Sequence, residues 1–204
     1  MQDPLFFTFS IAILIMSVVV HELAHGFTAD FLGDPTARLA GRLTINPVKH
    51  LDPVGSFILP VLSFMSAGFI FGWAKPVPYN PYNLKGRYGE AMVAAAGPGV
   101  NFLIALAFGL VIRFFGEGFS ASFLDIALVV VTINLILAIF NMIPIPPLDG
   151  SKVVFNLLPF RFEEWERKLE QYGFFVLIFF VFFGWQYISP VVSTLTHLIT
   201  GLAP

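Results

Sequence analysis

The chain has 204 residues, of which 57% are hydrophobic and 12% are charged. A soluble domain usually carries about 25% charged residues, so this composition, with its 25 phenylalanines, indicates a polytopic membrane protein. The formal net charge of −2 gives no reason to expect a nucleic-acid partner. Because the sequence contains no cysteine, any metal ion must be held by His, Asp or Glu side chains.

Long stretches without Lys, Arg or Asp follow one another along the chain. They are Leu5–Ala29, Pro53–Ala74, Ala91–Ile112, Ile126–Leu148 and the stretch from Gln171 to the C-terminus. Each is long enough to span a membrane, which takes about 20 apolar residues in a helix. We therefore predict an all-α polytopic membrane protein, a bundle of about four to six transmembrane helices. The last stretch is expected to bend at Ser189-Pro190 or to form two segments.

The basic residues favour one topology over another. If every stretch crossed the membrane, the 11 Lys and Arg residues would be divided between the two sides. If Pro53–Ala74 instead enters and returns on one side, every basic residue except Arg113 becomes cytoplasmic, as the positive-inside rule favours. Glycines and a proline interrupt this stretch, so we predict a re-entrant segment near residues 53–74 and an N-terminus outside the cell.

The first stretch contains His21-Glu22-Leu23-Ala24-His25. On a helix, residues four apart share a face, so His21 and His25 can bind one metal ion. Glu22 between them is the usual general base of a zinc hydrolase. Such a motif can arise by chance, but two histidines and a carboxylate inside a membrane are costly unless they have a function. The motif predicts zinc-dependent hydrolysis within the membrane.

Catalytic zinc usually has three protein ligands, so the motif requires another His, Asp or Glu. Some candidates for this third ligand fit less well because they lie in polar loops or near the terminus. They are Asp30, Asp34, Asp52 and His197. Two stronger candidates are His50 and Asp149. The re-entrant topology brings Asp149 to the membrane face of the histidines, and three prolines before it break the helix. An ordinary Asp-Gly turn outside the bilayer is the competing interpretation, and spacing alone does not separate the two.

Asn101 and Asn141 are uncharged polar residues within apolar spans. Each could form interhelical hydrogen bonds or could orient substrate and stabilise an oxyanion. The small residues of Ala96-Gly97-Pro98-Gly99 favour close helix packing next to Asn101. The proline-rich stretch from Gly72 to Pro81 is expected to be extended, and an exposed strand there could pair with an unwound substrate peptide.

In combination these motifs resemble the site-2 protease family of intramembrane zinc metalloproteases, in its compact prokaryotic branch. The resemblance rests on His21–Gly26, Asn46–Pro53, Gly72–Pro76, Gly97–Asn101 and Asn141–Gly150. It implies that His21, His25 and Asp149 bind Zn²⁺. It also implies that Glu22 is the catalytic base and that Asn141 assists the oxyanion.

The chain departs from many members of that family in two respects. It has no room for a PDZ or CBS domain, so residues 1–204 are expected to form a single integral membrane metalloprotease domain. The His-Glu-x-x-His motif lies in the first apolar stretch, whereas many relatives have an additional helix before it. The resemblance therefore implies nothing about how this chain is regulated through such domains or such a helix.

The predicted function is zinc-dependent endopeptidase activity on transmembrane segments of membrane proteins. The protein is expected in the cell membrane, multi-pass and in contact with the lipid bilayer, with its active site towards the cytoplasmic side. A membrane metal-ion transporter is the alternative, and it predicts ligands at successive depths along a path. A scaffold with a structural metal is a third possibility, although nothing structural requires Glu22. The sequence carries no signal for an oligomeric state.

Overall fold

The computed structural model describes residues 4–58, 65, 74–159 and 163–202, and the regular elements of these residues are all helices. The longer ones are α1 (Pro4–Phe31), α4 (Gly89–Phe115), α5 (Ala121–Asn141) and α7 (Glu163–Thr200). The shorter ones are α2 (Thr36–Leu39), η1 (Pro47–His50), η2 (Val54–Ile58), η3 (Pro81–Asn83), η4 (Gly116–Gly118) and α6 (Asp149–Leu157). The predicted all-α fold is confirmed.

Local sequence explains where the long helices begin and end. Gly33, two residues after α1, has a φ of 107°, a conformation that glycine adopts without strain at helix C-termini. The Ser120 hydroxyl accepts a hydrogen bond of 3.3 Å from Phe123 N and caps the start of α5. α5 ends at Asn141, inside the apolar stretch that runs on to Leu148, because prolines at 144, 146 and 147 cannot continue the helix.

Within the described ranges, three helical segments are long and apolar enough to cross a membrane: α1, α4 continued through η4, and α5. α7 supplies a fourth if its two parts, Gln171–Phe180 and Phe183–Thr200, count as one bent span. Four is the lower end of the predicted range. Most of the predicted re-entrant segment near 53–74 lies outside the described residues, so that prediction is not tested.

The sequence predicted that the last stretch bends at Ser189-Pro190 or forms two segments, and α7 does consist of two parts. They meet at an angle of 65° between Phe180 and Phe183, so the bend lies before Gly184 rather than at Ser189-Pro190. A Cβ atom on Gly184 would lie 2.6 Å from the Phe180 ring, so the ring packs where a side chain would otherwise stand. Pro190 is accommodated inside the helix, where its carbonyl accepts a hydrogen bond of 2.8 Å from the Thr194 hydroxyl.

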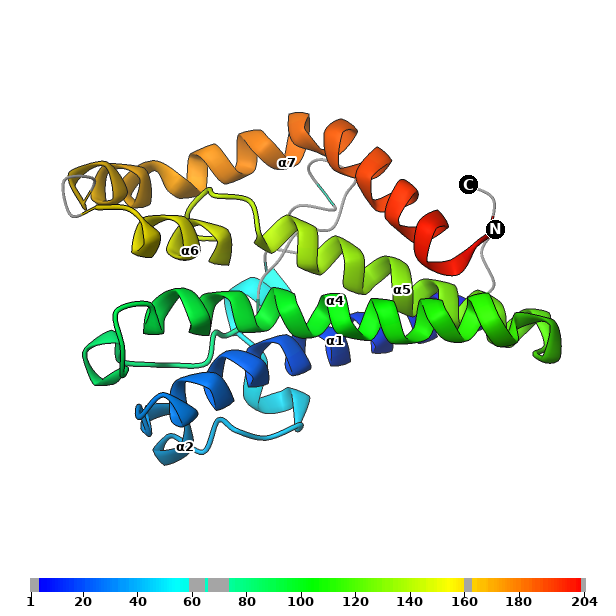
Figure 1. The fold of residues 1–204 in the computed structure, drawn as a ribbon, viewed down its shortest axis with the longest axis horizontal. Coiled ribbons are helices and arrows are strands. Elements are labelled where there is room, and N and C mark those ends of the chain that lie inside the picture. Colours follow the sequence, from blue (N-terminus) through cyan, green and yellow to red (C-terminus); the bar gives the residue numbers. More distant parts are fainter. Residues whose placement is uncertain (1–3, 59–64, 66–73, 160–162, 203–204) are drawn as a thin grey trace.

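α4 lies at the centre of the fold and contacts α1, α5, α6 and α7 (Figure 1). In lipid there is little hydrophobic force between helices, so close packing of small side chains has to hold them together. Gly109 of α4 illustrates this, because a Cβ atom there would lie 2.2 Å from Ile199 Cγ2 of α7. A buried cluster from α4, α5 and α7 surrounds this contact: Ala105, Ile112, Ala127, Val131, Leu135, Ile188, Val192 and Ile199.

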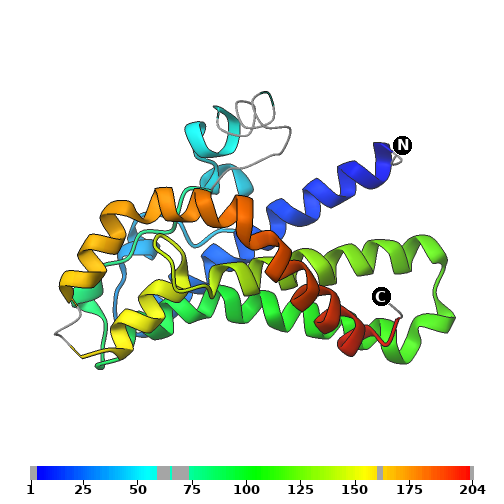
Figure 2. The same cartoon turned by 90° about the horizontal axis from the view of Figure 1, so that it is seen from above.

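The two ends of the bundle differ in charge. The C-terminal end of α1, the start of α4 and the whole of α6 gather at one end, whereas both termini lie at the other (Figures 1 and 2). Arg113 is at the end with the termini, where its guanidinium donates a hydrogen bond of 2.6 Å to Leu198 O. Arg38 of α2, Lys85 and Arg87 before α4, and Lys152 of α6 belong to the opposite end. This separation agrees with the charge distribution on which the predicted topology rests.

An extended segment, residues 74–80, runs beside the C-terminal half of α1. Lys75 N donates a hydrogen bond of 2.9 Å to His50 O, and the Arg42 guanidinium donates one of 2.8 Å to Lys75 O. Further along, Asn80 N donates one of 2.7 Å to the Asp34 carboxylate. These hydrogen bonds hold the segment against η1 and the loops on either side of α2, and no β-ladder occurs among the described residues.

Candidate metal centre

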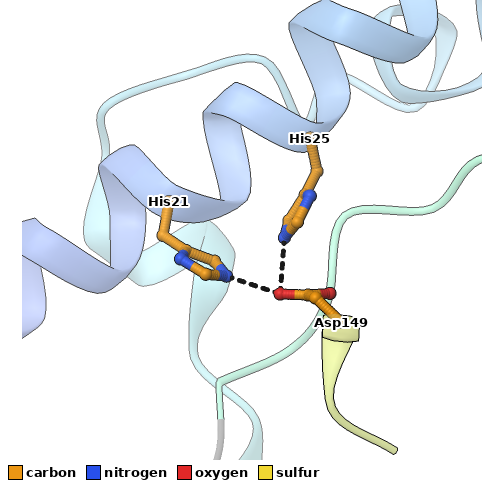
Figure 3. Close-up of side chains that lie close together, drawn as sticks. All are labelled: His21, His25 and Asp149. Carbon is orange, nitrogen blue, oxygen red and sulfur yellow. Dashed lines mark hydrogen bonds and ion pairs between the residues drawn. The ribbon is translucent and has the colours of Figure 1, made fainter. Parts of the chain in front are cut away.

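α1 places the two motif histidines on one face of the helix. His21 and His25 are one turn apart, and their ring centroids lie 4.7 Å from each other. Both are buried, with 6% and 8% of their surface exposed. The rings point away from the axis of α1 towards the start of α6 (Figure 3), so burial and helical spacing together produce a pair of convergent imidazoles.

The break after α5 brings Asp149 to these rings. Asp149 is the first residue of α6, and its Oδ2 lies 3.0 Å from His21 Nε2 and 3.3 Å from His25 Nε2. Gly150 permits the turn, since a Cβ atom there would lie 2.2 Å from Met142 O. Asp149 thus presents one carboxylate oxygen to both rings.

Hydrogen bonds on the far side of each ring determine which nitrogen carries the proton. His25 Nδ1 lies 2.7 Å from Val93 O, and a carbonyl can only accept, so Nδ1 carries the hydrogen. The Nε2 atom of His25 then presents a lone pair. His21 Nδ1 lies 2.5 Å from the amide oxygen of Asn101, which has the same consequence. Metal-binding histidines commonly have a partner of this kind on their other nitrogen.

The donor set fits a divalent metal ion. Ligand atoms of His21, His25 and Asp149 all lie within 4.8 Å of one another. With neutral imidazoles, two lone pairs and a carboxylate would face one another, an arrangement that repels unless a cation lies between them. Gly97 of α4 leaves the necessary space, because a Cβ atom there would lie 2.4 Å from His25 Nε2 and 2.6 Å from His21 Nε2. Two histidines and one carboxylate form a ligand set typical of catalytic zinc.

Glu22 is half-buried and makes a contact that the sequence did not predict. Its carboxylate accepts a hydrogen bond of 2.7 Å from the backbone N–H of Val77, in the extended segment. Gly26 allows this approach, since a Cβ atom there would lie 2.9 Å from Val77 Cγ1. No motif signalled Val77 as a partner, because the contact is made by backbone from a segment 55 residues away.

The other candidate residues make their described hydrogen bonds outside the cluster. The Asn141 amide donates a hydrogen bond of 2.9 Å to Leu137 O in its own helix. His50 is 2% exposed, and its Nε2 lies 2.9 Å from Thr44 O, so it holds its own loop. His197 belongs to the end of α7 near the C-terminus.

Asn101 forms interhelical hydrogen bonds, one of the two roles that the sequence left open, and it also contacts His21, which the sequence did not predict.

The fold and this cluster define a class: a multi-pass membrane protein with a buried site for a metal ion beside a carboxylate. Residues 110–184 match the model of Peptidase family M50. The "Putative zinc metalloprotease YwhC" of Bacillus subtilis (strain 168) is 39% identical over 177 residues, 82% of this chain and 78% of that protein. The chain belongs to Peptidase family M50, the site-2 proteases, and zinc is the metal of its site.

Two mycobacterial relatives are more distant and longer. The "Putative zinc metalloprotease Rip2" of Mycolicibacterium smegmatis is 31% identical over 176 residues, 84% of this chain and 66% of that protein. Its namesake in Mycobacterium tuberculosis (strain H37Rv) is 28% identical over 173 residues, 85% of this chain and 65% of that protein. The chain thus spans about two thirds of these relatives. No solved structure gives a significant match.

Proposed function

We propose that this chain is an intramembrane endopeptidase that cleaves membrane proteins in or near their transmembrane segments, with residues 1–204 as a single metalloprotease domain. The observation that carries the proposal is the convergence of His21, His25 and Asp149 in a helix bundle, with Glu22 next to His21. Family membership and the names of the relatives support a metalloprotease. The membrane-spanning helices that surround the site support a substrate within the bilayer.

His21, His25 and Asp149 would hold the zinc ion. When bound there, zinc supplies Lewis-acid polarisation of the scissile carbonyl and of water. Asp149 contributes a negative charge to an otherwise neutral pair of imidazoles, and its place at the start of α6 is favourable for a carboxylate.

Glu22 would act as general base and then as general acid. It takes the proton of the attacking water and delivers it to the leaving amine. The hydrogen bond from Val77 N orients one carboxylate oxygen, Oε2, and leaves Oε1 for this proton transfer. The orientation depends on backbone, so it does not change with the side chain at position 77.

The substrate must unwind before it can be cleaved. A transmembrane helix satisfies its own backbone hydrogen bonds, so the scissile peptide bond is inaccessible until the helix opens locally. Helix-breaking residues near the cleavage site should therefore assist. The charged end of the bundle, where His25 and α6 lie, would face the cytoplasm and admit water.

Asn141 is proposed as a donor to the oxyanion. Its amide has two hydrogens, and one is used by Leu137 O. The other is available to a substrate that enters beside the last turn of α5. Asn141→Leu should then lower kcat more than it changes KM or zinc content, because an oxyanion donor acts mainly in the transition state.

The decisive variant is Glu22→Gln. Glutamine keeps an oxygen that accepts from Val77 N but cannot take up a proton, so only the basicity is lost. In proteoliposomes with a reporter membrane protein, the variant should retain zinc and lose cleavage. Cleavage at the wild-type rate would disprove the mechanism. Zinc flux into the vesicles that is equal in both proteins, without cleavage in either, would instead indicate a transporter.

A further inference from the structure

Three polar side chains form a continuous chain across α1, α4 and α5 inside the bundle. Asn101 and Asn134 are 0% exposed, and Ser17 is 6% exposed. The Asn101 amide nitrogen donates a hydrogen bond of 2.7 Å to the Asn134 amide oxygen. Asn134 Nδ2 in turn donates hydrogen bonds of 2.9 Å to Ser17 Oγ and to Val130 O. Amides of this kind hydrogen-bond between the helices of membrane bundles, and here the hydrogen bonds continue to a histidine of the metal centre.

The direction of every hydrogen bond in this chain follows from one backbone carbonyl. Val130 O can only accept, so the nitrogen of the Asn134 amide must face it. The oxygen of Asn134 then faces Asn101 and requires a donor, which is the Asn101 amide nitrogen. A second carbonyl, Ser17 O, accepts from the same nitrogen at 3.4 Å and agrees with this orientation.

The consequence reaches the metal centre. With its nitrogen turned to Asn134, Asn101 presents its oxygen to His21 Nδ1 at 2.5 Å. That oxygen requires a hydrogen on Nδ1, so the lone pair of His21 is on Nε2, the atom that faces Asp149. If Asn101 turned over, its nitrogen would favour the opposite tautomer, with a hydrogen on Nε2 where zinc must bind.

We propose that Asn134 is a positioning residue that sets the tautomer of His21 through Asn101, with the Val130 carbonyl as the fixed reference. The inference rests on the zinc-hydrolase function proposed above. Asn134 is two steps from the ligand, and it acts on zinc affinity through orientation rather than contact. Its sequence context, an asparagine in an apolar span, gave no signal of this role.

The second histidine provides an internal control. His25 Nδ1 donates to Val93 O, a backbone carbonyl that no substitution in the Asn101–Asn134 chain can turn over. Changes at position 134 should therefore affect His21 and leave His25 unchanged. A general loosening of the bundle would affect both.

The test compares three variants of α5 in purified full-length protein. Asn134→Leu removes the acceptor that orients Asn101. Asn134→Asp restores it, because a carboxylic acid buried in apolar surroundings stays neutral, accepts from Asn101 and donates to Val130 O. Thr132→Val is the matched control, since Thr132 lies on the same helix but lines the groove towards α7.

Two measurements are made on each variant. In chelator competition, Asn134→Leu should weaken zinc binding by about tenfold, the lower end of the range for outer-shell partners, while Asn134→Asp and Thr132→Val stay near wild type. In proton spectra of the zinc-loaded protein with ¹⁵N-labelled histidine, the downfield Nδ1–H signal of His21 should shift or broaden in Asn134→Leu. The corresponding signal of His25 should not change.

Each outcome decides the proposal. Wild-type zinc affinity in Asn134→Leu, or equal changes at both histidines, would overturn it. If Asn134→Leu does not fold, the proton spectrum of the zinc-loaded wild type still tests the proposal. The absence of a hydrogen on His21 Nδ1 in that spectrum would also overturn it. Neither measurement uses cleavage. If the expected changes in zinc affinity and in the His21 signal are absent while the protein still cleaves its substrate, only the role of Asn134 is rejected. If these changes occur but the protein cleaves nothing, only the proposed function is rejected.

Discussion

The backbone N–H of Val77 donates a hydrogen bond of 2.7 Å to the carboxylate of Glu22. The bond joins the residue that would move protons to the backbone of a segment that is far away in sequence. The extended segment is therefore part of the site, because its backbone determines how Glu22 points.

Replacing Val77 by proline removes this donor. We expect Val77→Pro to lower kcat/KM by about 10- to 100-fold, the equivalent of a hydrogen bond to a charged group, with zinc content unchanged. Val77→Ala is the matched control, because it shortens the side chain and keeps the N–H. The comparison uses cleavage of a reporter membrane protein by each variant. Equal losses in both would show that packing against Gly26, and not the hydrogen bond, explains the effect.

Gly97 and Gly99 provide a matched pair for the metal centre. A Cβ atom on Gly97 would lie within 2.6 Å of Nε2 of both histidines, whereas one on Gly99 would meet nothing within 4 Å. Gly97→Ala should therefore prevent zinc binding, as measured by metal analysis of purified protein. Gly99→Ala should bind zinc normally and gain about 0.5–1 kcal/mol in helix stability. Full zinc occupancy in Gly97→Ala would mean that the ion does not bind between the two rings.

Asp149 and His50 were the two candidates for the third ligand. In the structure Asp149 lies against the histidines, and His50 hydrogen-bonds within its own loop. Asp149→Ala should lose zinc. His50→Ala should retain zinc and unfold at a lower temperature, because a buried side chain with a hydrogen bond is removed. Zinc lost from His50→Ala but retained by Asp149→Ala would reverse the assignment.

Asp34 should make stability depend on acid. Burial would raise the pKa of its carboxyl, but hydrogen bonds from Thr36, Asn83 and Asn80 lower it below 3.8, its ordinary value. A carboxyl whose pKa is lower in the folded state than in the unfolded state stabilises the fold fully at a pH above its unfolded-state pKa. This stabilisation is lost as the pH falls through its folded-state pKa. Unfolding temperatures in detergent should thus fall below about pH 4.

Asp34→Asn should lower the unfolding temperature at neutral pH and weaken this acid dependence, since the amide cannot accept all of these bonds. Asp125→Asn, at an exposed position near the start of α5, is the control and should behave as wild type. If the unfolding temperature of Asp34→Asn falls with pH as it does in the wild type, a group other than Asp34 is responsible for the acid dependence.

Features that are local in sequence could be predicted. Apolar length predicts the helices α1, α4 and α5, and the i, i+4 spacing places His21 and His25 on one face whatever the rest of the chain does. The prolines after Asn141 predict a break there, because proline cannot continue a helix. For the last stretch the sequence predicted either a bend at Ser189-Pro190 or two segments, and the structure has two parts that meet before Gly184.

Contacts between distant segments could not be predicted in this way. The sequence by itself determined an all-α membrane protein that carries a pair of metal-binding histidines with an adjacent base, because hydropathy and helical periodicity act within a single element. Only the tertiary structure decided that Asp149 lies against that pair, that Val77 orients Glu22, and that Asn134 faces Asn101. Each of these depends on the angle at which helices pack and on where a glycine lets them approach, and neither can be read from residue spacing along the chain.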